Sequence, residues 1–387
     1  MSKSNFYLLV SLPTSISPSA DQDEAFSSLQ ATASKESELV VPFSIPEFKI
    51  GTLDALVQQA DDLAKLEAHC EAVAGKVGES LKSVLEGDED KVAQQKTVND
   101  KPLDQYLRSF NWNKVKYRAD RPIGNLIDIL QKEISSIDND VKSKYNQYNQ
   151  VKTNLNALQK RQTGNLSNKS LAPIVSPDLI VRDSEYIETH LIAVPAQQKK
   201  EFLKSYETLS SWIVPRSAVQ VAADDEFILY TVTTFKKYSH DFIHKCREQK
   251  WIPRDYKYKE GGRDEEKKEL EKVSREERKL WGEILRLART NWGEAVMAWI
   301  HVLVLRVFVE TVLRYGLPLA FICGLVKTTP KQTKKLKGAL DTNYGYLAGN
   351  AIGRDKKGRA IKDNSADMQT AGADDYSAYV CYEFEIN

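Results

Sequence analysis

Two long stretches of the chain carry apolar residues at steps of three or four, and neither stretch contains a proline. This spacing places the apolar side chains on one face of an α-helix. An apolar helix face needs a partner, and each stretch is the nearest candidate partner for the other, so the sequence predicts an antiparallel coiled coil. The apolar positions are Ile123, Ile127, Leu130, Ile134, Ile137, Val141, Tyr145, Tyr148, Val151, Leu155 and Leu158 in the first stretch, and Leu270, Val273, Trp281, Ile284, Ala288, Trp292, Ala295, Trp299 and Val302 in the second.

The segment between the two helices has a different period, with strand-like and helix-like runs in alternation. Their order is β-α-β-β-α-β, which is compatible with a split β-α-β sandwich in which helices cover one face of a four-stranded sheet. The expected strands are 185–194, 217–222, 226–234 and 252–258, and the expected helices are 197–210 and 235–250.

Both ends of the sequence also carry strand-like alternation, at 6–12, 319–326 and 380–386. These strands are expected to share one sheet. A long helix is indicated over 53–84, and the Ser-, Pro- and Asp-rich residues 13–37 before it are expected to form a loop.

Together these elements predict a mixed α+β protein with the shape of an elongated dumbbell. Two α/β globular domains are expected at the ends of a long antiparallel coiled-coil neck, whose first helix alone spans roughly 50 Å at about 1.5 Å per residue. A rigid spacer of this kind suits a protein that holds two partners apart, or together. The expected parts are a domain built from both termini (1–122 and 316–387), a helical neck (123–162 and 263–315) and a middle domain (163–262).

The composition limits the possible classes of function. The chain has 387 residues, 41% of them hydrophobic, so it is long enough for two or three domains with real cores. Its 55 Lys and Arg against 54 Asp and Glu give a net charge of +1, which offers no overall field for nucleic acid or a membrane surface. The four cysteines are far apart in sequence, so neither a disulfide framework nor a zinc ribbon is expected, and a reducing compartment fits best.

One stretch, Ala295–Leu313, is apolar enough to resemble a transmembrane helix. It contains His301, Arg306 and Glu310, and a charged residue near the centre of a bilayer costs about 2.5 to 3.5 kcal/mol on the insertion scale. We therefore expect a buried core helix and no direct membrane insertion. The apolar run Asn5–Pro13 is too short for the core of a usual signal peptide and is expected to be a strand.

No complete catalytic or cofactor site is found in the sequence. His240 and His244 stand four apart on an expected helix, but a zinc enzyme needs a third ligand and usually a general base, so a surface helix is favoured. Neither G-x-x-x-x-G-K-[ST] nor G-x-G-x-x-G is present, and the spaced glycines of 344–353 are expected to serve close packing or a turn. The sequence therefore predicts no cofactor, no metal and no active site.

Basic residues concentrate in the last part of the chain. They are open to two interpretations, a patch that binds a partner or a solvated face, and the solvated face is favoured on general grounds. The residues are Lys327, Lys331, Lys334, Lys335 and Lys337, followed by Arg354, Lys356, Lys357 and Arg359.

Several stretches resemble the C-subunit family of the vacuolar-type proton-translocating ATPase (V-ATPase), in its fungal form. None of them is a chemical motif, and their physical roles look like packing, turns and helix ends. They follow one another from near residue 40 to near residue 360, so the resemblance covers nearly the whole chain. The stretches are Ser44–Leu56, Tyr148–Leu155, Gly164–Ser167, Lys204–Leu209, Trp251–Arg254, Val307–Pro318, Gly349–Ala351 and Asp355–Gly358.

The resemblance implies an elongated protein with a head, a neck and a foot, the foot being made by both termini. In that family the protein is not the catalyst but a cytosolic collar piece of the V1 sector, on the cytosolic face of vacuolar and other endomembranes. Its head is expected to bind one peripheral-stalk heterodimer of the E and G subunits. Its foot is expected to meet a second such heterodimer and the N-terminal domain of the membrane a-subunit. The protein is also expected to leave the complex during reversible disassembly of the pump.

No family motif fixes the residues that make these contacts. Because they cluster charge in an otherwise neutral chain, we nominate a basic loop as part of the foot contact, consisting of Lys331, Lys334, Lys335 and Lys337.

Two other classes of function stay open at this point. A dumbbell with two binding ends suits a free coiled-coil adaptor that crosslinks cytoskeletal filaments such as actin. An enzyme that uses the middle domain through His240 and His244 is a third hypothesis, and the incomplete set of ligands argues against it.

Overall fold

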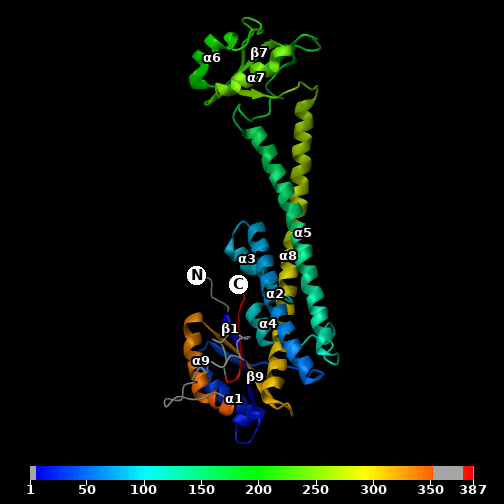
Figure 1. The fold of residues 1–387 in the computed structure, drawn as a ribbon, viewed down its shortest axis with the longest axis vertical. Coiled ribbons are helices and arrows are strands. Elements are labelled where there is room, and N and C mark those ends of the chain that lie inside the picture. The colour runs from blue at the N-terminus through cyan, green and yellow to red at the C-terminus, as the bar shows by residue number, and fades with distance from the viewer. Residues whose placement is uncertain (1–5, 352–377, 387) are drawn as a thin grey trace. The chain divides into compact units, whose positions relative to one another are not determined.

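The structure is a computed structural model that describes residues 6–351 and 378–386. It is a mixed α+β protein, as expected (Figure 1). The chain divides into two compact units: unit 1 consists of Met1–Tyr145 with Glu283–Asn387, and unit 2 of Asn146–Gly282. The two longest helices, α5 (Ile123–Thr163) and α8 (Gly262–Tyr315), contribute residues to both units.

Unit 1 contains a four-stranded antiparallel sheet in the order β10-β1-β9-β2. The central strand β1 comes from the start of the chain and pairs with two strands from its end, so that Val10 lies opposite Gly324 on one side and Cys381 on the other. The prediction that the terminal strands share a sheet is confirmed. The strands are β1 (Phe6–Pro13), β2 (Leu39–Pro42), β9 (Phe321–Thr328) and β10 (Val380–Glu385).

Alternate side chains of β1 lie on opposite faces of this sheet, as the pleat of a strand requires. Leu8, Val10 and Leu12 join one core, and Tyr7 and Leu9 join another with the long helices. The sheet is therefore a middle layer with helices on both faces. The helices over the first face are α1 (Gln22–Ala33) and α9 (Pro330–Tyr344).

The loop expected over residues 13–37 is wrong, because this segment contains helix α1. The side chain of Asp21 caps the helix, since it accepts hydrogen bonds at 3.1 Å from two backbone N–H groups of the first turn. Every fourth residue from Ala25 is buried against the sheet, and the polar Ser, Gln and Thr residues between them obscured that period. The buried residues are Ala25, Leu29 and Ala33.

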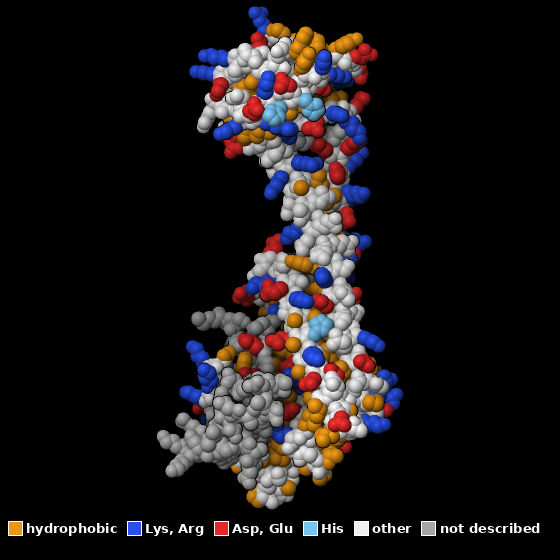
Figure 2. Space-filling view, in the orientation of Figure 1, with side chains coloured by type: hydrophobic (Ala, Val, Ile, Leu, Met, Phe, Trp, Pro, Cys, Tyr) orange, Lys and Arg blue, Asp and Glu red, His pale blue; other side chains and the backbone are white. Residues whose placement is uncertain are grey.

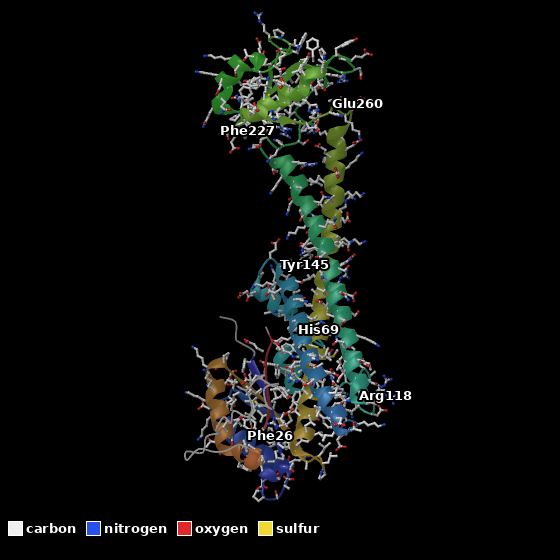
Figure 3. The ribbon with its side chains drawn as sticks, in the orientation of Figure 1. Phe26, His69, Arg118, Tyr145, Phe227 and Glu260 are labelled. Carbon is white, nitrogen blue, oxygen red and sulfur yellow. The ribbon has the colours of Figure 1, made fainter. Side chains whose placement is uncertain are left out.

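Three helices pack together over the second face of the sheet, because α2 (Leu53–Val84), α5 and α8 contribute to one core. Polar contacts also join α2 to α5: the Tyr145 hydroxyl donates to Ser83 at 2.7 Å, and Gln131 lies 3.2 Å from the His69 ring (Figure 3). Within unit 1, the apolar face of α5 is thus buried together with both α2 and α8. Between α2 and α5 the chain forms two short helices, α3 (Glu89–Gln95) and α4 (Leu103–Arg108). A small hairpin is formed there by β3 (Thr97–Val98) and β4 (Lys101–Pro102).

The apolar stripe predicted for α8 is wrong at one position. Leu280 is 5% exposed, whereas Trp281 is 39% exposed. A step of seven from Val273 leads to Leu280 and a step of four leads on to Ile284, so these residues share a helix face. Trp281 lies about 100° further round the helix, outside the buried stripe.

The apolar part of α8 lies in the centre of unit 1. Among the residues that the structure describes, α8 is the one helix long and apolar enough to cross a membrane, and 83% of its most apolar window is buried. The end of the helix is bonded to the sheet, because Thr311 Oγ1 donates to Ser11 Oγ at 2.9 Å and the Tyr315 hydroxyl donates to Ser11 O at 2.8 Å. This burial agrees with the expected core helix.

The charged residues of this stretch have partners within unit 1. Arg306 pairs with Glu67 of α2 and lies over the ring of Tyr382, with 4.4 Å between the guanidinium carbon and the ring centroid. Glu310 pairs with Arg314 one turn later, at 2.6 Å. These pairs satisfy charges that would be costly to bury alone.

Unit 2 contains a second four-stranded antiparallel sheet, in the order β6-β7-β5-β8. Its elements follow the order expected between residues 185 and 258, with both helices in the same core over one face of the sheet. The opposite face is covered by the segment that follows α5, through Leu166, Leu171 and Val175. The elements are β5 (Ile187–Pro195), α6 (Lys199–Ser205), β6 (Val219–Ala223), β7 (Phe227–Phe235), α7 (Ser239–Glu248) and β8 (Ile252–Arg254).

His301 of α8 is buried among aromatic rings and has a defined tautomer. Its Nε2 accepts a hydrogen bond at 3.1 Å from the backbone N–H of Asn113, so Nδ1 must carry the proton that it donates to Met297 O at 2.7 Å. The rings of Trp112 and Tyr117 each lie 4.7 Å from the imidazole, centroid to centroid. Burial lowers the pKa of His301 to about 4.

We predict that His301 makes unit 1 less stable in mild acid. Between about pH 6.5 and 4 the unfolded chain binds the imidazole proton and the folded chain does not, so the free energy of unfolding falls as the pH falls, by about 3 kcal/mol in total. The slope of unfolding free energy against pH in this window should become shallower in His301→Gln. Urea unfolding at a series of pH values measures it.

The control for this prediction is His244→Gln, because the His244 side chain is 74% exposed. This variant should keep the slope of the unmodified chain. Equal slopes for His301→Gln and the unmodified chain would contradict the assignment of a neutral buried imidazole.

Candidate interaction surfaces

The basic residues nominated from the sequence belong to a helix, so the expected basic loop is wrong. Pro330 starts α9, and Lys331, Lys334 and Lys335 lie exposed on its first two turns. Lys337 is half-buried and pairs with Glu383 of β10. The structure thus leaves three of the four nominated lysines fully at the surface of unit 1.

Lys327, the first residue of the same basic run, is buried, so it does not belong to a solvated face. Its Nζ lies 2.7 Å from Asp104 Oδ2 and 5.8 Å from the centroid of the Tyr7 ring. The Tyr7 hydroxyl donates to the same carboxylate. Burial acts to raise the pKa of Asp104, but the hydrogen bonds from Lys327 and Tyr7 outweigh it and hold that pKa below its usual value. Lys327 therefore joins β9 to α4.

The remaining basic residues of the run lie outside the described residues, as does Asp355–Gly358 of the family resemblance. They are Arg354, Lys356, Lys357 and Arg359.

His240 and His244 lie exposed on α7, as the surface-helix interpretation expected. His244 Nδ1 is 3.3 Å from Glu248 Oε1, and Asp241 pairs with Lys245 at 3.1 Å. Over residues 6–351 and 378–386, no group of three His, Cys, Asp or Glu side chains is placed to hold a metal ion.

The cysteines offer no reactive thiolate in the cores. Cys70, Cys246 and Cys323 are buried and unpaired with one another. Burial raises the pKa of both Cys70 and Cys246 to about 12, so these thiols stay protonated at neutral pH.

A hollow in unit 2 lies between the end of α5 and the β6–β7 turn, with a volume of about 580 Å³. Asp224 from that turn is occupied by structural bonds: its carboxylate accepts from the N–H groups of Leu166, Glu226 and Phe227 at 2.6 to 2.9 Å. These bonds tie the hairpin to the segment after α5. Asp224 therefore has a structural role at the edge of this hollow.

A surface group that the sequence analysis missed is formed by three aromatic side chains of unit 2, Trp212, Phe235 and Tyr238, here called the aromatic cluster. The Trp212 and Tyr238 rings stack at 5.4 Å with 5° between their planes, and the Phe235 ring meets Trp212 edge-on at 5.6 Å. Trp212 is 47% exposed and Phe235 is 37% exposed. The residues come from separate segments, so periodicity within one segment could not reveal the cluster.

A comparison with protein families matches residues 7–380 of the chain to the family described as the V-ATPase C-subunit. The chain belongs to the V-ATPase C-subunit family. The V-type proton ATPase C-subunit 1 of Macaca fascicularis is 39% identical over 368 residues, which are 94% of this chain and 94% of that protein. The V-type proton ATPase C-subunit of Saccharomyces cerevisiae is 38% identical over 381 residues, 98% and 97% of the two chains.

The animal and yeast members of the family are therefore about equally similar to this chain. Among solved structures, the cytoplasmic N-terminal domain of the I-subunit, a homologue of the V-ATPase a-subunit, aligns over 88% of this chain and 97% of its own length, with 13% identity and a TM-score of 0.33. That score is too low to support an argument about fold or function.

We predict that the Lys327 pair stabilises unit 1 more than an exposed pair does. Asp104→Asn removes the carboxylate nearest to the buried ammonium group and leaves it only the more distant Glu38 carboxylate, at 4.0 Å, so the free energy of unfolding should fall by about 1 to 3 kcal/mol. The matched control is Asp138→Asn. The partner of Asp138 is Lys76, which lies 3.4 Å away and whose side chain is 64% exposed, so this variant should lower the free energy of unfolding by less than about 0.5 kcal/mol. Chemical denaturation measures both, and equal losses would count against a special role for Asp104.

Proposed function

We propose that this chain serves a V-type proton ATPase as a non-catalytic peripheral component of the cytosolic V1 sector. It acts as a stator that bridges peripheral-stalk E–G heterodimers to the N-terminal domain of the membrane a-subunit, and it controls the reversible assembly of V1 with the membrane sector. In this role it lies on the cytosolic face of vacuolar and other endomembranes. The observation that supports the proposal best is the match to the yeast C-subunit over 98% of this chain and 97% of that protein.

The division of labour that we propose follows the domain boundaries inferred from the sequence. The foot comprises 1–122 and 316–387, the neck 123–162 and 263–315, and the head 163–262, arranged as a dumbbell with a coiled-coil neck. Support comes from the two separate sheets, each with its own hydrophobic cores, because two independently packed units can each present a binding surface.

Several modest contacts on one protein explain how a stator can be both firm and releasable. Once one site is bound, the second binds at a high effective concentration, so the combined affinity exceeds either affinity alone by about 10² to 10⁴. Loss of one contact therefore weakens the whole attachment strongly. A pump that disassembles on a signal needs this property.

The foot contact that we propose includes Lys331, Lys334, Lys335 and Lys337. The first turn of α9 contains no acidic residue, and three of these lysines are exposed. Clustered positive charge favours a partner surface that is acidic, and attraction between the two accelerates their encounter.

The proposed function is tested by binding of the full chain to two purified partners, the E–G heterodimer and the N-terminal domain of the a-subunit. Isothermal titration calorimetry should give saturable binding to both. If neither partner binds, the assignment as a stator is wrong. Co-sedimentation with actin filaments in that case would favour the filament-adaptor hypothesis.

We predict that charge reversal on α9 weakens the foot contact selectively. The triple variant Lys331→Glu, Lys334→Glu, Lys335→Glu should bind the N-terminal domain of the a-subunit about 10-fold more weakly at low salt. The control is a triple variant with the same change in charge at exposed lysines elsewhere in unit 1: Lys114→Glu, Lys132→Glu and Lys142→Glu. Equal affinities of the two triple variants would remove α9 from the interface.

A further inference from the structure

Lys96 and Trp292 form a small polar group at the edge of the core of unit 1, where three helices meet. Lys96 follows α3 as its C-cap residue, and its ammonium group lies 5.7 Å from the centroid of the Trp292 ring of α8. Gly78 of α2 borders both side chains, because the point where a Cβ on Gly78 would lie is 3.4 Å from Lys96 Nζ and 3.6 Å from Trp292 Nε1. An ammonium group and an indole N–H therefore face the same space, beside a residue without a side chain.

The indole N–H of Trp292 is a buried donor. Trp292 is 2% exposed and belongs to the core that the sheet shares with the long helices, and its Nε1 makes no hydrogen bond to any described residue. An indole nitrogen can only donate, and a buried donor without an acceptor is costly. The position therefore favours a group that brings an oxygen atom close to Trp292 Nε1.

Lys96 also lacks the partner that a half-buried charge needs. Over residues 6–351 and 378–386, no carboxylate forms an ion pair with its ammonium group. Burial lowers the pKa of Lys96; the Glu79 carboxylate opposes this effect and Lys82 adds to it. Lys96 is thus a free amine for a larger fraction of the time than an exposed lysine is, and only the free amine is a nucleophile.

Lys91 of the same short helix provides the contrast. Its side chain is 66% exposed and pairs with Asp88 at 2.9 Å, and the hydrogen bond to Asp88 raises the pKa of Lys91. Lys and Arg side chains lie among Asp and Glu side chains over the surface around α3 (Figure 2). Lys91 is therefore a paired surface charge, whereas Lys96 faces an aromatic ring and an N–H group.

We propose that Lys96 is a site of acetylation by an acyl thioester, at which the new amide oxygen accepts a hydrogen bond from Trp292 Nε1. The free amine of Lys96 attacks the carbonyl carbon of the thioester. A C–N bond forms, the C–S bond breaks, and the sulfur leaves as a thiol with the proton that the nitrogen gives up. The product is a neutral amide, so the half-buried charge is removed. This site does not depend on the proposed function.

An acetyl group suits this position in size as well as in charge. The carbonyl oxygen of the amide lies about 2.2 Å from Nζ by standard bond lengths, so it enters the space that Nζ shares with the indole nitrogen. A methyl group at the Cβ position of Gly78 would make only ordinary van der Waals contacts, so this side of α2 leaves room for a small group. Acetylation thus replaces the contact between the ammonium group and the Trp292 ring by a hydrogen bond from the indole to the amide.

The first test measures acetylation of the unmodified full chain by acetyl coenzyme A at about pH 8. Mass spectrometry of proteolytic peptides gives the extent of reaction at each lysine against time. Lys96 should react about 3-fold faster than Lys91 or more, because a larger fraction of its amine is unprotonated, although Lys96 is less exposed. A rate at Lys96 equal to or below that at Lys91 overturns the inference.

Gly78→Ala and Gly75→Ala form a matched pair of variants for the same measurement. Both place alanine in the interior of α2 and raise its helix propensity, but Gly78 is buried beside Lys96, whereas Gly75 is exposed with no neighbouring group within 4 Å of its Cβ position. Gly78→Ala should slow the reaction at Lys96 several-fold, because the added methyl group occupies the space of the acetyl group. Gly75→Ala should leave the rate unchanged, and equal rates in the two variants would contradict the proposed site.

A spectroscopic test addresses the hydrogen bond itself. Nε-acetyllysine is introduced at position 96 of the full chain by genetic encoding, and the indole N–H signals of nitrogen-15 tryptophan-labelled protein are compared with those of the unmodified chain. Trp292→Phe identifies the Trp292 signal. This signal should move downfield on acetylation, whereas the signal of Trp281, an exposed residue of the same helix, should stay in place. An unmoved Trp292 signal means that the acetyl oxygen does not accept this hydrogen bond, and the inference is then wrong.

Discussion

The burial of the apolar part of α8 is the constraint on which the rest of unit 1 depends. This segment is buried almost all round, so no single neighbour can cover it. The terminal sheet covers it on one side, and α2 and α5 share its core on the other. Lipid could cover the same apolar surface, but the bonds of His301 and the ion pair of Arg306 with Glu67 match a protein interior.

Periodicity predicted the long elements because burial on one face leaves a clear pattern in a sequence. The extents of α2 and α5, the position of the core helix and the shared terminal sheet all follow from such patterns. Helix α1 was missed because only every fourth residue from Ala25 is fully buried, and most of the other residues are polar. The sequence signal that could have revealed the start of α1 was its N-cap residue, Asp21, with two acidic residues in the first turn of the helix.

The surfaces were harder to predict, because they depend on contacts between distant segments. In the basic run, Lys327 is buried beside Asp104 while Lys331 is exposed, and the sequence alone does not distinguish them. The aromatic cluster likewise depends on the pairing of residues 212–214 with the end of β7. The chemistry of a side chain can be read from a sequence, but its neighbours in space cannot.

The central position of β1 in the terminal sheet also sets an order of events during synthesis. Unit 2 is one continuous segment, so all of its strands have been made once residue 282 leaves the ribosome. Strand β1, made first, must wait for β9 and then β10, more than 300 residues later, before both of its edges are paired. During that interval an apolar strand with open edges is a target for chaperones and for aggregation. A ribosome that stalls after residue 282 but before β9 therefore leaves a chain with a complete unit 2 and an unfinished unit 1.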